Sequence, residues 1–233
     1  MSGPPADPHA GQSVAQVGAP LAEAVGAVVL LHGRGATASG ILSLAPEMGD
    51  ARWAFRAPQA AGGAWYPHSF LAPLAANEPG LSSGVRAAMT AVADAEAAGI
   101  PRERIVLAGF SQGACLALET AARHAGRWGG VLAFSGGLIG TGPGPDDGPP
   151  LAGMGGHYAD KSFDYDGTFA GTPVLVAGSD RDPHIPLVRM ERTAEVFRQL
   201  GAAVDLRVHP GWGHAVHPEA VAAARTLLTR LAG

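Results

Sequence analysis

The stretch that decides the fold is IVLAGFSQG, residues 105–113. Its first four residues are apolar, as in a strand buried on both faces, and the small residues that follow at 114–118 (ACLAL) are typical of a closely packed helix. Ser111 stands between the two patterns, with a glycine two residues before it and another two residues after it. This arrangement predicts a nucleophile elbow, a sharp turn that exposes the serine hydroxyl at the carboxyl end of a strand.

Similar patterns recur along the chain and predict the rest of the architecture. Amphipathic helical patterns, with apolar residues three or four apart, follow Ser82 and Ser83 up to Gly99, include Met190, Ala194 and Phe197, and cover 218–231. We expect Ser82 or Ser83 to cap the first of these helices. Strands that alternate with helices predict an α/β fold with a mostly parallel central sheet and helices on both of its faces. Further short apolar or alternating runs lie at 27–31, 53–56, 130–134, 173–177 and 204–208.

Two segments fall outside this alternation. Residues 1–22 are rich in Gly, Pro and Ala without periodicity, so we expect a flexible N-terminal extension before a single domain over residues 23–233. Residues 140–171 begin with a Gly/Pro-rich stretch and continue with aromatic residues. A loop of this length in a compact domain is functional or disordered, and we expect this one to border a pocket.

The composition excludes several classes of function. The chain has 233 residues, of which 15% are charged, and a net charge of -4, with no basic stripe for nucleic acid. No apolar stretch approaches the roughly 20 residues that span a bilayer, and the N-terminus lacks the pattern of a secretory signal. Cys115 is the sole cysteine, so no disulfide can form within the chain. We therefore expect a cytoplasmic protein, monomeric or homodimeric, without nucleic-acid partners.

A serine nucleophile needs a base and a carboxylate that orients the base. In an open parallel sheet the reactive groups lie on loops at the carboxyl ends of the strands. Of the nine histidines, His214 is best placed, because it follows the strand ending at Val208 through the flexible turn PGWG. His32, His209 and His217 have simpler structural interpretations: the first braces a glycine turn, the second ends a strand, and the third caps a helix.

The loop after residue 177 offers two candidate carboxylates, Asp180 and Asp182. Asp180 can form an Asx turn or pair with Arg181. Asp182 precedes a proline, which favours an extended backbone and makes a stiff mount for a side chain that must hold an imidazole. We predict Asp182 as the third member of the triad.

Hydrolysis through a tetrahedral intermediate also requires donors for the developing oxyanion. The backbone N–H of Gln112 begins a helix, where it has no intrahelical partner and the helix dipole favours an anion. Arg34, directly after His32-Gly33, is the candidate for the second amide. Its guanidinium either meets an anionic substrate or is solvated or salt-bridged.

Four motifs occur together and in order: LHGRGA at 31–36, GIPRERIVLAGFSQGA at 99–114, DPHIP at 182–186 and GWGH at 211–214. Together they resemble the phospholipase/carboxylesterase family of α/β-hydrolases, which includes acyl-protein thioesterases and small bacterial carboxylesterases. The resemblance covers nearly everything after residue 25 and implies the α/β-hydrolase fold. It implies a triad of Ser111, Asp182 and His214, with an oxyanion hole formed by the backbone amides of Arg34 and Gln112.

The resemblance also points to the substrate pocket. Trp65 and Tyr66 look like an aromatic pair that lies near the acyl pocket in the family. Family members commonly carry Leu and Asp where this chain has Arg34 and Ala36, and commonly Met in place of Trp212. These departures surround the acyl and leaving-group sites, so we include Trp212 with Trp65 and Tyr66 as pocket candidates.

We therefore predict a serine hydrolase that cleaves carboxylic esters of small or medium acyl groups through an acyl-enzyme, without a cofactor. Thioester, lactone and amide substrates stay open as alternatives, as does a noncatalytic binding module on the same scaffold. A metal site is disfavoured, because His214 and His217 are three residues apart but have no third ligand at a suitable spacing.

Overall fold

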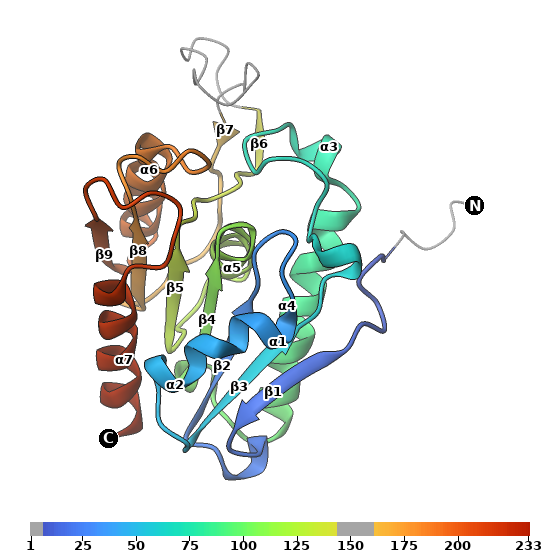
Figure 1. Cartoon of the computed structure of the whole chain (residues 1–233), viewed down its shortest axis with the longest axis vertical. Coiled ribbons are helices and arrows are strands. Elements are labelled where there is room, and N and C mark those ends of the chain that lie inside the picture. Colours follow the sequence, from blue (N-terminus) through green and yellow to red (C-terminus); the bar gives the residue numbers. More distant parts are fainter. Residues whose placement is uncertain (1–6, 144–160) are drawn as a thin grey trace.

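A seven-stranded sheet forms the centre of the molecule (Figure 1). The computed structural model describes residues 7–143 and 161–233. Within them, all neighbouring strands of this sheet are parallel except the first two of the order β1-β3-β2-β4-β5-β8-β9. The strands are β1 (Val14–Gly18), β2 (Gly26–Leu31), β3 (Trp53–Pro58), β4 (Ile105–Phe110), β5 (Gly130–Phe134), β8 (Pro173–Gly178) and β9 (Ala203–Val208).

Helices cover both faces of the sheet, as the sequence pattern predicts (Figure 1). Successive residues of a strand point to opposite faces, so Val29 and Leu31 of β2 join one core while Val28 and Leu30 join the other. The first core includes α4 (Gly80–Ala97), α5 (Gln112–Arg123) and α6 (Leu187–Gln199); the second includes α1 (Ala38–Ile41), α2 (Ala45–Met48) and α7 (Pro218–Ala232).

Short elements complete the connections. They are α3 (Leu74–Asn77), the single turns η1 (Leu21–Glu23), η2 (Leu42–Leu44), η3 (Ala61–Gly63) and η4 (Arg102–Arg104), and the paired two-residue strands β6 (Gly142–Pro143) and β7 (Lys161–Ser162). The pair β6–β7 lies within the stretch 140–171 that we expected to border a pocket; the middle of that stretch, 144–160, lies outside the described residues.

The N-terminal segment differs from the expectation of a flexible extension. Its described part, residues 7–22, contains β1, which pairs antiparallel with β3 and forms one edge of the main sheet. The sequence VAQVG is short and mostly exposed, so it lacks the apolar run of a central strand, and its backbone groups are satisfied by a partner about 40 residues away. Residues 1–6 lie outside the described part.

The start of α4 is a second correction. The helix begins at Gly80, and its N-cap residue is Pro79 and not Ser82 or Ser83. The apolar pattern that begins at Val85 therefore marks the helix but not its first turn. Ser83 is fully buried inside the helix, where its hydroxyl donates to Asp7 of the N-terminal segment.

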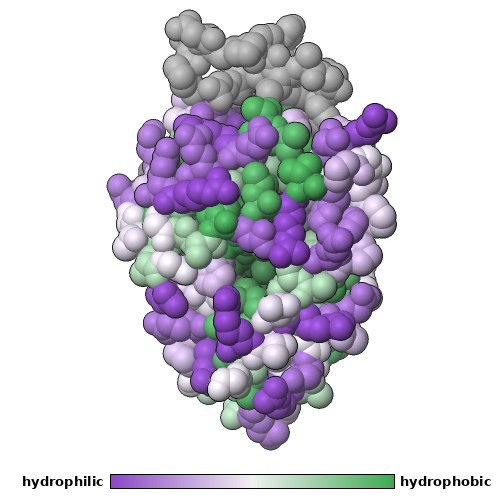
Figure 2. All heavy atoms as spheres, turned by 90° about the vertical axis from the view of Figure 1, so that its left-hand side faces the viewer, coloured by the Kyte–Doolittle hydropathy of each residue, from purple (hydrophilic) through white to green (hydrophobic). Residues whose placement is uncertain are grey.

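The surface is a mixture of polar side chains and smaller apolar areas. On the side that carries β9, α6 and α7, an apolar band runs between polar groups (Figure 2). Among the helices of the described residues, none has the length and apolar character needed to cross a bilayer.

Candidate active site

The turn between β4 and α5 holds Ser111 in a strained backbone conformation. Its φ is 56° and its ψ is -120°, outside the regions that residues with a side chain readily adopt. A Cβ on Gly109 would lie 2.4 Å from the backbone of Gly113, and a Cβ on Gly113 would lie 2.1 Å from the carbonyl oxygen of Leu31. The two glycines of the motif are therefore required for the turn, and the turn brings the serine hydroxyl out of the sheet.

A chain of hydrogen bonds joins three loops at the carboxyl ends of β4, β8 and β9. His214 lies between the other two side chains, with its Nε2 2.8 Å from Oγ of Ser111 and its Nδ1 2.7 Å from Oδ2 of Asp182. Because a carboxylate can only accept, the Nδ1 proton of His214 is donated to Asp182, which leaves Nε2 free to accept from the serine hydroxyl. The structure thus brings together the three residues predicted as the triad.

Asp182 is held as a charged group. Its side chain is fully buried, which favours the neutral acid, but it accepts hydrogen bonds from His214 and from the backbone N–H groups of His184 (2.8 Å) and Ile185 (3.0 Å). These bonds outweigh burial, so the pKa of Asp182 lies below its usual value. An ionised carboxylate beside Nδ1 fixes the ring orientation of His214 and stabilises its protonated form.

Asp180, the other candidate carboxylate, binds the backbone of the loop that carries His214. Its Oδ1 accepts a hydrogen bond from the N–H of Gly211 at 2.7 Å, and Oγ of Ser179 accepts from the N–H of Gly213 at 3.1 Å. Both bonds hold the loop that carries His214. Asp180 thus has a structural role, which was the alternative to a place in the triad. Its partner is the loop that carries His214 and not Arg181.

The amides of Arg34 and Gln112 lie at the same end of the sheet. In the part of the chain that the structure describes, neither N–H donates to another protein group. The Nδ1–H of His32 donates to the carbonyl of Gly33 at 2.8 Å, and the N–H of Ala60 donates to its Nε2 at 3.1 Å. Burial lowers the pKa of His32, which keeps the ring neutral in this bridging role.

The side chains of Arg34 and Gln112 bind a neighbouring segment, residues 65–68, which we call the wall segment. The guanidinium of Arg34 donates to the carbonyls of Pro67 (2.9 Å) and His68 (2.6 Å). The side chain of Gln112 accepts from the N–H of residue 65 at 2.9 Å and donates to the carbonyl of residue 66 at 2.8 Å. The sequence carried no signal for these backbone contacts.

A cavity of about 640 Å³ opens beside Ser111. Tyr66 lines this cavity, as expected, but the other two pocket candidates do not. Trp65, the first residue of the wall segment, is fully buried, and its Nε1–H donates to the carbonyl of His32. Trp212 is 47% exposed and packs edge-on against His217. The cavity is lined instead by Tyr66, Phe70, Phe110, Cys115, His184 and Ile185, among others.

Cys115 also lies on the cavity wall, one helical turn after Ser111. Burial raises the pKa of its thiol to about 12, and the backbone N–H of Gly137 donates to its sulfur at 3.4 Å. The thiol is therefore neutral and belongs to the packing of the wall, as expected for a small buried residue.

The sequence profile of a family described as Phospholipase/Carboxylesterase matches residues 12–143, more than half of the chain. The chain belongs to the phospholipase/carboxylesterase family. The matched range contains Ser111 but ends before Asp182 and His214. The contacts of these two residues with each other and with the serine are seen in the structure. The fold is that of the α/β-hydrolases.

Proteins similar to this chain include a phospholipase/carboxylesterase and two acyl-protein thioesterases. The crystal structure of a phospholipase/carboxylesterase from Dyadobacter fermentans is similar, with 37% sequence identity, a TM-score of 0.80, and coverage of 94% of this chain and 96% of that one. Acyl-protein thioesterase 1 of Gibberella zeae is 32% identical over 121 residues, which are 52% of this chain but only 45% of the thioesterase. Acyl-protein thioesterase 1 of Eremothecium gossypii is 28% identical over 211 residues, 83% of this chain and 82% of that protein.

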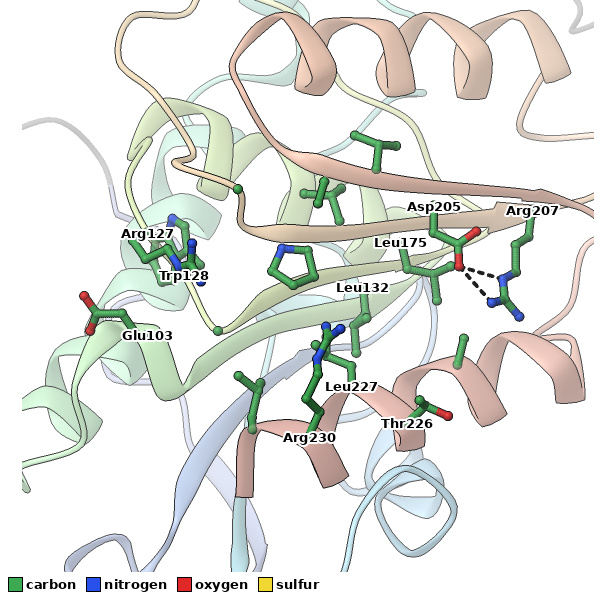
Figure 3. A pocket seen from close by; sticks show the side chains of 18 of the residues that line it. Glu103, Arg127, Trp128, Leu132, Leu175, Asp205, Arg207, Thr226, Leu227 and Arg230 are labelled. Atoms are coloured by element: carbon green, nitrogen blue, oxygen red, sulfur yellow. Dashed lines mark hydrogen bonds and ion pairs between the residues drawn. The ribbon is translucent and has the colours of Figure 1, made fainter. Parts of the chain in front are cut away.

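This member of the phospholipase/carboxylesterase family has a second cavity, of about 750 Å³, near the amino ends of β8 and β9 (Figure 3). It lies between these strands and α7, with Leu175 and Leu227 on its walls and an ion pair between Asp205 and Arg207 at its side. Among the described residues that line it there is no serine, cysteine or histidine, and thus no pair of nucleophile and base like that at Ser111. The carboxyl-terminal edge of the sheet, where ligands of open α/β sheets bind, holds the Ser111 cavity instead.

Three possible metal ligands in this family member also lie apart from the triad. His209, His217 and Glu219 have ligand atoms within 4.8 Å of one another, and they are the one such group among the described residues. The two rings stack face to face at 3.6 Å, so their in-plane lone pairs run parallel and do not converge on one ion. Nδ1 of His217 already accepts from the N–H of Glu219 and caps α7, as expected for that histidine.

Proposed function

We propose that this protein is a serine hydrolase that cleaves carboxylic esters of small or medium acyl groups through an acyl-enzyme. The observation that carries the proposal is the continuous hydrogen-bond chain from Asp182 through His214 to Ser111, next to an open cavity of about 640 Å³. Membership in the phospholipase/carboxylesterase family supports the class of substrate.

The geometry supports a two-step reaction. Oγ of Ser111 attacks the ester carbonyl carbon while Nε2 of His214 takes the hydroxyl proton, and Asp182 stabilises the imidazolium. The negative oxygen then accepts hydrogen bonds from the amides of Arg34 and Gln112. When the C–O bond to the alcohol breaks, His214 returns the proton to the alcohol oxygen, and the acyl group stays on Ser111.

Water completes the cycle. His214 takes a proton from a water molecule, the resulting hydroxide attacks the acyl carbon, and a second tetrahedral intermediate forms with its oxygen in the same pair of amides. The bond to Oγ then breaks, the proton on Nε2 passes to the serine oxygen, and the carboxylic acid leaves. Every proton in this sequence is carried by His214, so no metal or cofactor is needed to balance it.

The shape of the cavity supports a small or medium acyl group. Its walls include Phe70, Tyr66 and Cys115. Tyr66 is 2% exposed and Cys115 1% exposed, so both are tightly packed and close the cavity on the side of α5. A long acyl chain would have to displace these closely packed side chains.

Thioesters are the second candidate substrates. The same nucleophile attacks either carbonyl, and a thiol leaves more readily than an alcohol because it is the stronger acid. The specific observation that favours this candidate is the similarity to two proteins named acyl-protein thioesterase 1.

The proposal is tested by the hydrolysis of p-nitrophenyl esters from acetate to palmitate by the wild type, by Ser111→Ala and by Ser39→Ala. Ser39 is exposed in α1 and serves as the matched control. We expect hydrolysis that is greatest with short or medium chains, is unchanged in Ser39→Ala and falls by at least about a thousandfold in Ser111→Ala. A folded Ser111→Ala variant with wild-type activity would overturn the proposal.

A further inference from the structure

His9 is buried although it lies close to the start of the chain. Only 5% of its surface is exposed, whereas its neighbours in the sequence face solvent. Its Nε2 lies 2.9 Å from the carbonyl oxygen of Trp65, and its Nδ1 lies 3.0 Å from the backbone nitrogen of Ala61. Since a backbone N–H only donates, Nδ1 accepts from Ala61 and the Nε2 proton is donated to Trp65.

The chain on both sides of His9 is attached to the rest of the fold. Asp7 forms an ion pair with Arg86 of α4 at 2.9 Å and accepts a hydrogen bond from Ser83 of the same helix. These two groups hold the pKa of Asp7 below its usual value. The backbone N–H of His9 also donates to Ser83, and β1 pairs with β3 a few residues further on. Residues 7–18, which we call the N-terminal arm, are thus fixed at both ends.

Trp65 connects the N-terminal arm to the site of the proposed reaction. Its carbonyl accepts from His9, its backbone N–H donates to the side chain of Gln112 at 2.9 Å, and its indole N–H donates to the carbonyl of His32 at 2.9 Å. The indole also contacts both imidazoles, with ring centroids 5.3 Å from His9 and 5.0 Å from His32. Gln112 supplies one candidate oxyanion amide, and His32 orients the peptide that supplies the other.

We infer that the N-terminal arm is a positioning element of the hydrolase site, and that His9 acts through Trp65 to hold the wall segment against the side chains of Gln112 and Arg34, the two residues whose amides are the candidate oxyanion donors. The inference rests on the proposed function. His9 itself touches no reacting atom, since its two ring nitrogens are both occupied by backbone groups. It is a positioning residue whose removal loosens the wall segment at the carbonyl of Trp65.

Two substitutions separate the two bonds of His9. In His9→Gln the side-chain amide reaches the carbonyl of Trp65 and replaces the Nε2 donor. In His9→Asn the shorter side chain keeps an acceptor near Ala61 but loses the bond to Trp65. Gln12→Ala, on an exposed residue of the same arm, is the control. We expect all variants to fold, which circular dichroism and thermal unfolding would check.

The measurements are kcat and KM for p-nitrophenyl butyrate, together with the inhibition constant of an alkylboronic acid, which forms a tetrahedral adduct with a serine. Because a loosened oxyanion site stabilises the tetrahedral state less well, we expect His9→Asn to lower kcat by about tenfold. We expect its boronic acid inhibition constant to rise by a similar factor, with little change in KM. His9→Gln and Gln12→Ala should stay within about threefold of the wild type on both measures.

Several outcomes would overturn the inference. Equal kinetic losses in His9→Asn and His9→Gln, or a lower melting temperature in His9→Asn with unchanged kcat, would show that His9 only stabilises the fold. The Ser111→Ala control distinguishes this failure from that of the proposed function. If Ser111→Ala is inactive and His9→Asn is fully active, the role of the arm fails alone; if Ser111→Ala is active, both fail.

Discussion

Nδ1 of His32 lies 2.8 Å from the carbonyl oxygen of Gly33, and this bond fixes the direction of the following amide. The Gly33 carbonyl and the Arg34 N–H belong to one planar peptide and point in opposite directions. A buried, neutral imidazole therefore aims one candidate oxyanion donor without contacting the substrate. The backbone N–H of Ala36 donates to the same carbonyl at 3.1 Å and closes a turn, so the imidazole and the turn together hold this peptide.

Replacing His32 by Leu should therefore impair turnover more than substrate binding. We expect kcat for p-nitrophenyl butyrate to fall by about a hundredfold, the loss that accompanies one misplaced oxyanion donor, with KM changed by less than about threefold. Steady-state kinetics on a variant shown to be folded would check this. A rise in KM with unchanged kcat would instead assign His32 to the binding of the substrate.

The two aspartates after β8 should differ in their effect on activity. Asp182→Asn leaves the geometry nearly intact but presents His214 with the wrong hydrogen-bond pattern, so we expect kcat to fall by about three to four orders of magnitude. Asp180→Asn retains an oxygen that can accept from Gly211, and its kcat should fall by less than about tenfold. The reverse ranking, measured with the same ester, would move the triad carboxylate to Asp180.

The stability of the protein should decrease in mild acid. Burial lowers the pKa of His32 and of His209, so between their folded values and the usual value of about 6.5 the unfolded chain binds more protons than the folded one. The free energy of unfolding should then fall as the pH drops below about 6.5, by at most about 1.4 kcal/mol per pH unit for each group. Urea unfolding of the wild type and His209→Gln between pH 7.5 and 5 would measure this; equal slopes would contradict it.

The thiol of Cys115 should be inert in the folded protein. Its pKa of about 12 leaves almost no thiolate at pH 8, and the residue is 1% exposed. We expect no reaction with 5,5′-dithiobis(2-nitrobenzoic acid) within an hour under native conditions, and one thiol per chain after unfolding in guanidinium. Rapid labelling of the native protein, with loss of esterase activity, would show instead that the cavity wall opens.

The glycine after the nucleophile should not tolerate a side chain. In Gly113→Ala the new Cβ would overlap the carbonyl oxygen of Leu31, a backbone atom that cannot move without disturbing β2. We expect a loss of more than about 3 kcal/mol in the free energy of unfolding, or no folded protein. Gly126→Ala is the matched control, because Gly126 has an ordinary φ and a Cβ there would meet nothing within 3.4 Å. Gly35 is unsuitable as a control because its φ is 75°.

Much of the fold could be predicted because its signals are local. The buried strands, the elbow at Ser111 and the helix at 218–231 each have an apolar pattern and a boundary residue within a few positions. The juxtaposition of Ser111, Asp182 and His214 followed from one topological rule, that parallel strands present their carboxyl ends to the same edge. The assignment of their catalytic roles stays a prediction, as do the single-domain organisation, the oligomeric state and the cytoplasmic location.

The errors arose where a long-range partner decides the structure. β1 has no strong strand pattern of its own and is ordered by pairing with β3. Trp65 and Tyr66 are adjacent, but the indole turns inward to the carbonyl of His32 while only the tyrosine faces the cavity. The two backbone carbonyls that the Arg34 guanidinium binds were not predicted, because no side-chain pattern reveals them; its meeting with an anionic substrate stays a prediction.

The double use of Arg34 and Gln112 limits how the substrate range of this protein can change. Their side chains bind the wall segment, and their amides are the proposed oxyanion donors. Rebuilding residues 65–68 to admit a larger acyl group would therefore shift the groups on which the rate depends, and selectivity and speed would change together. Ile185 lines the cavity and reaches Asp182 only through its backbone, so a substitution there offers a route to new substrates that leaves the rate-determining groups in place.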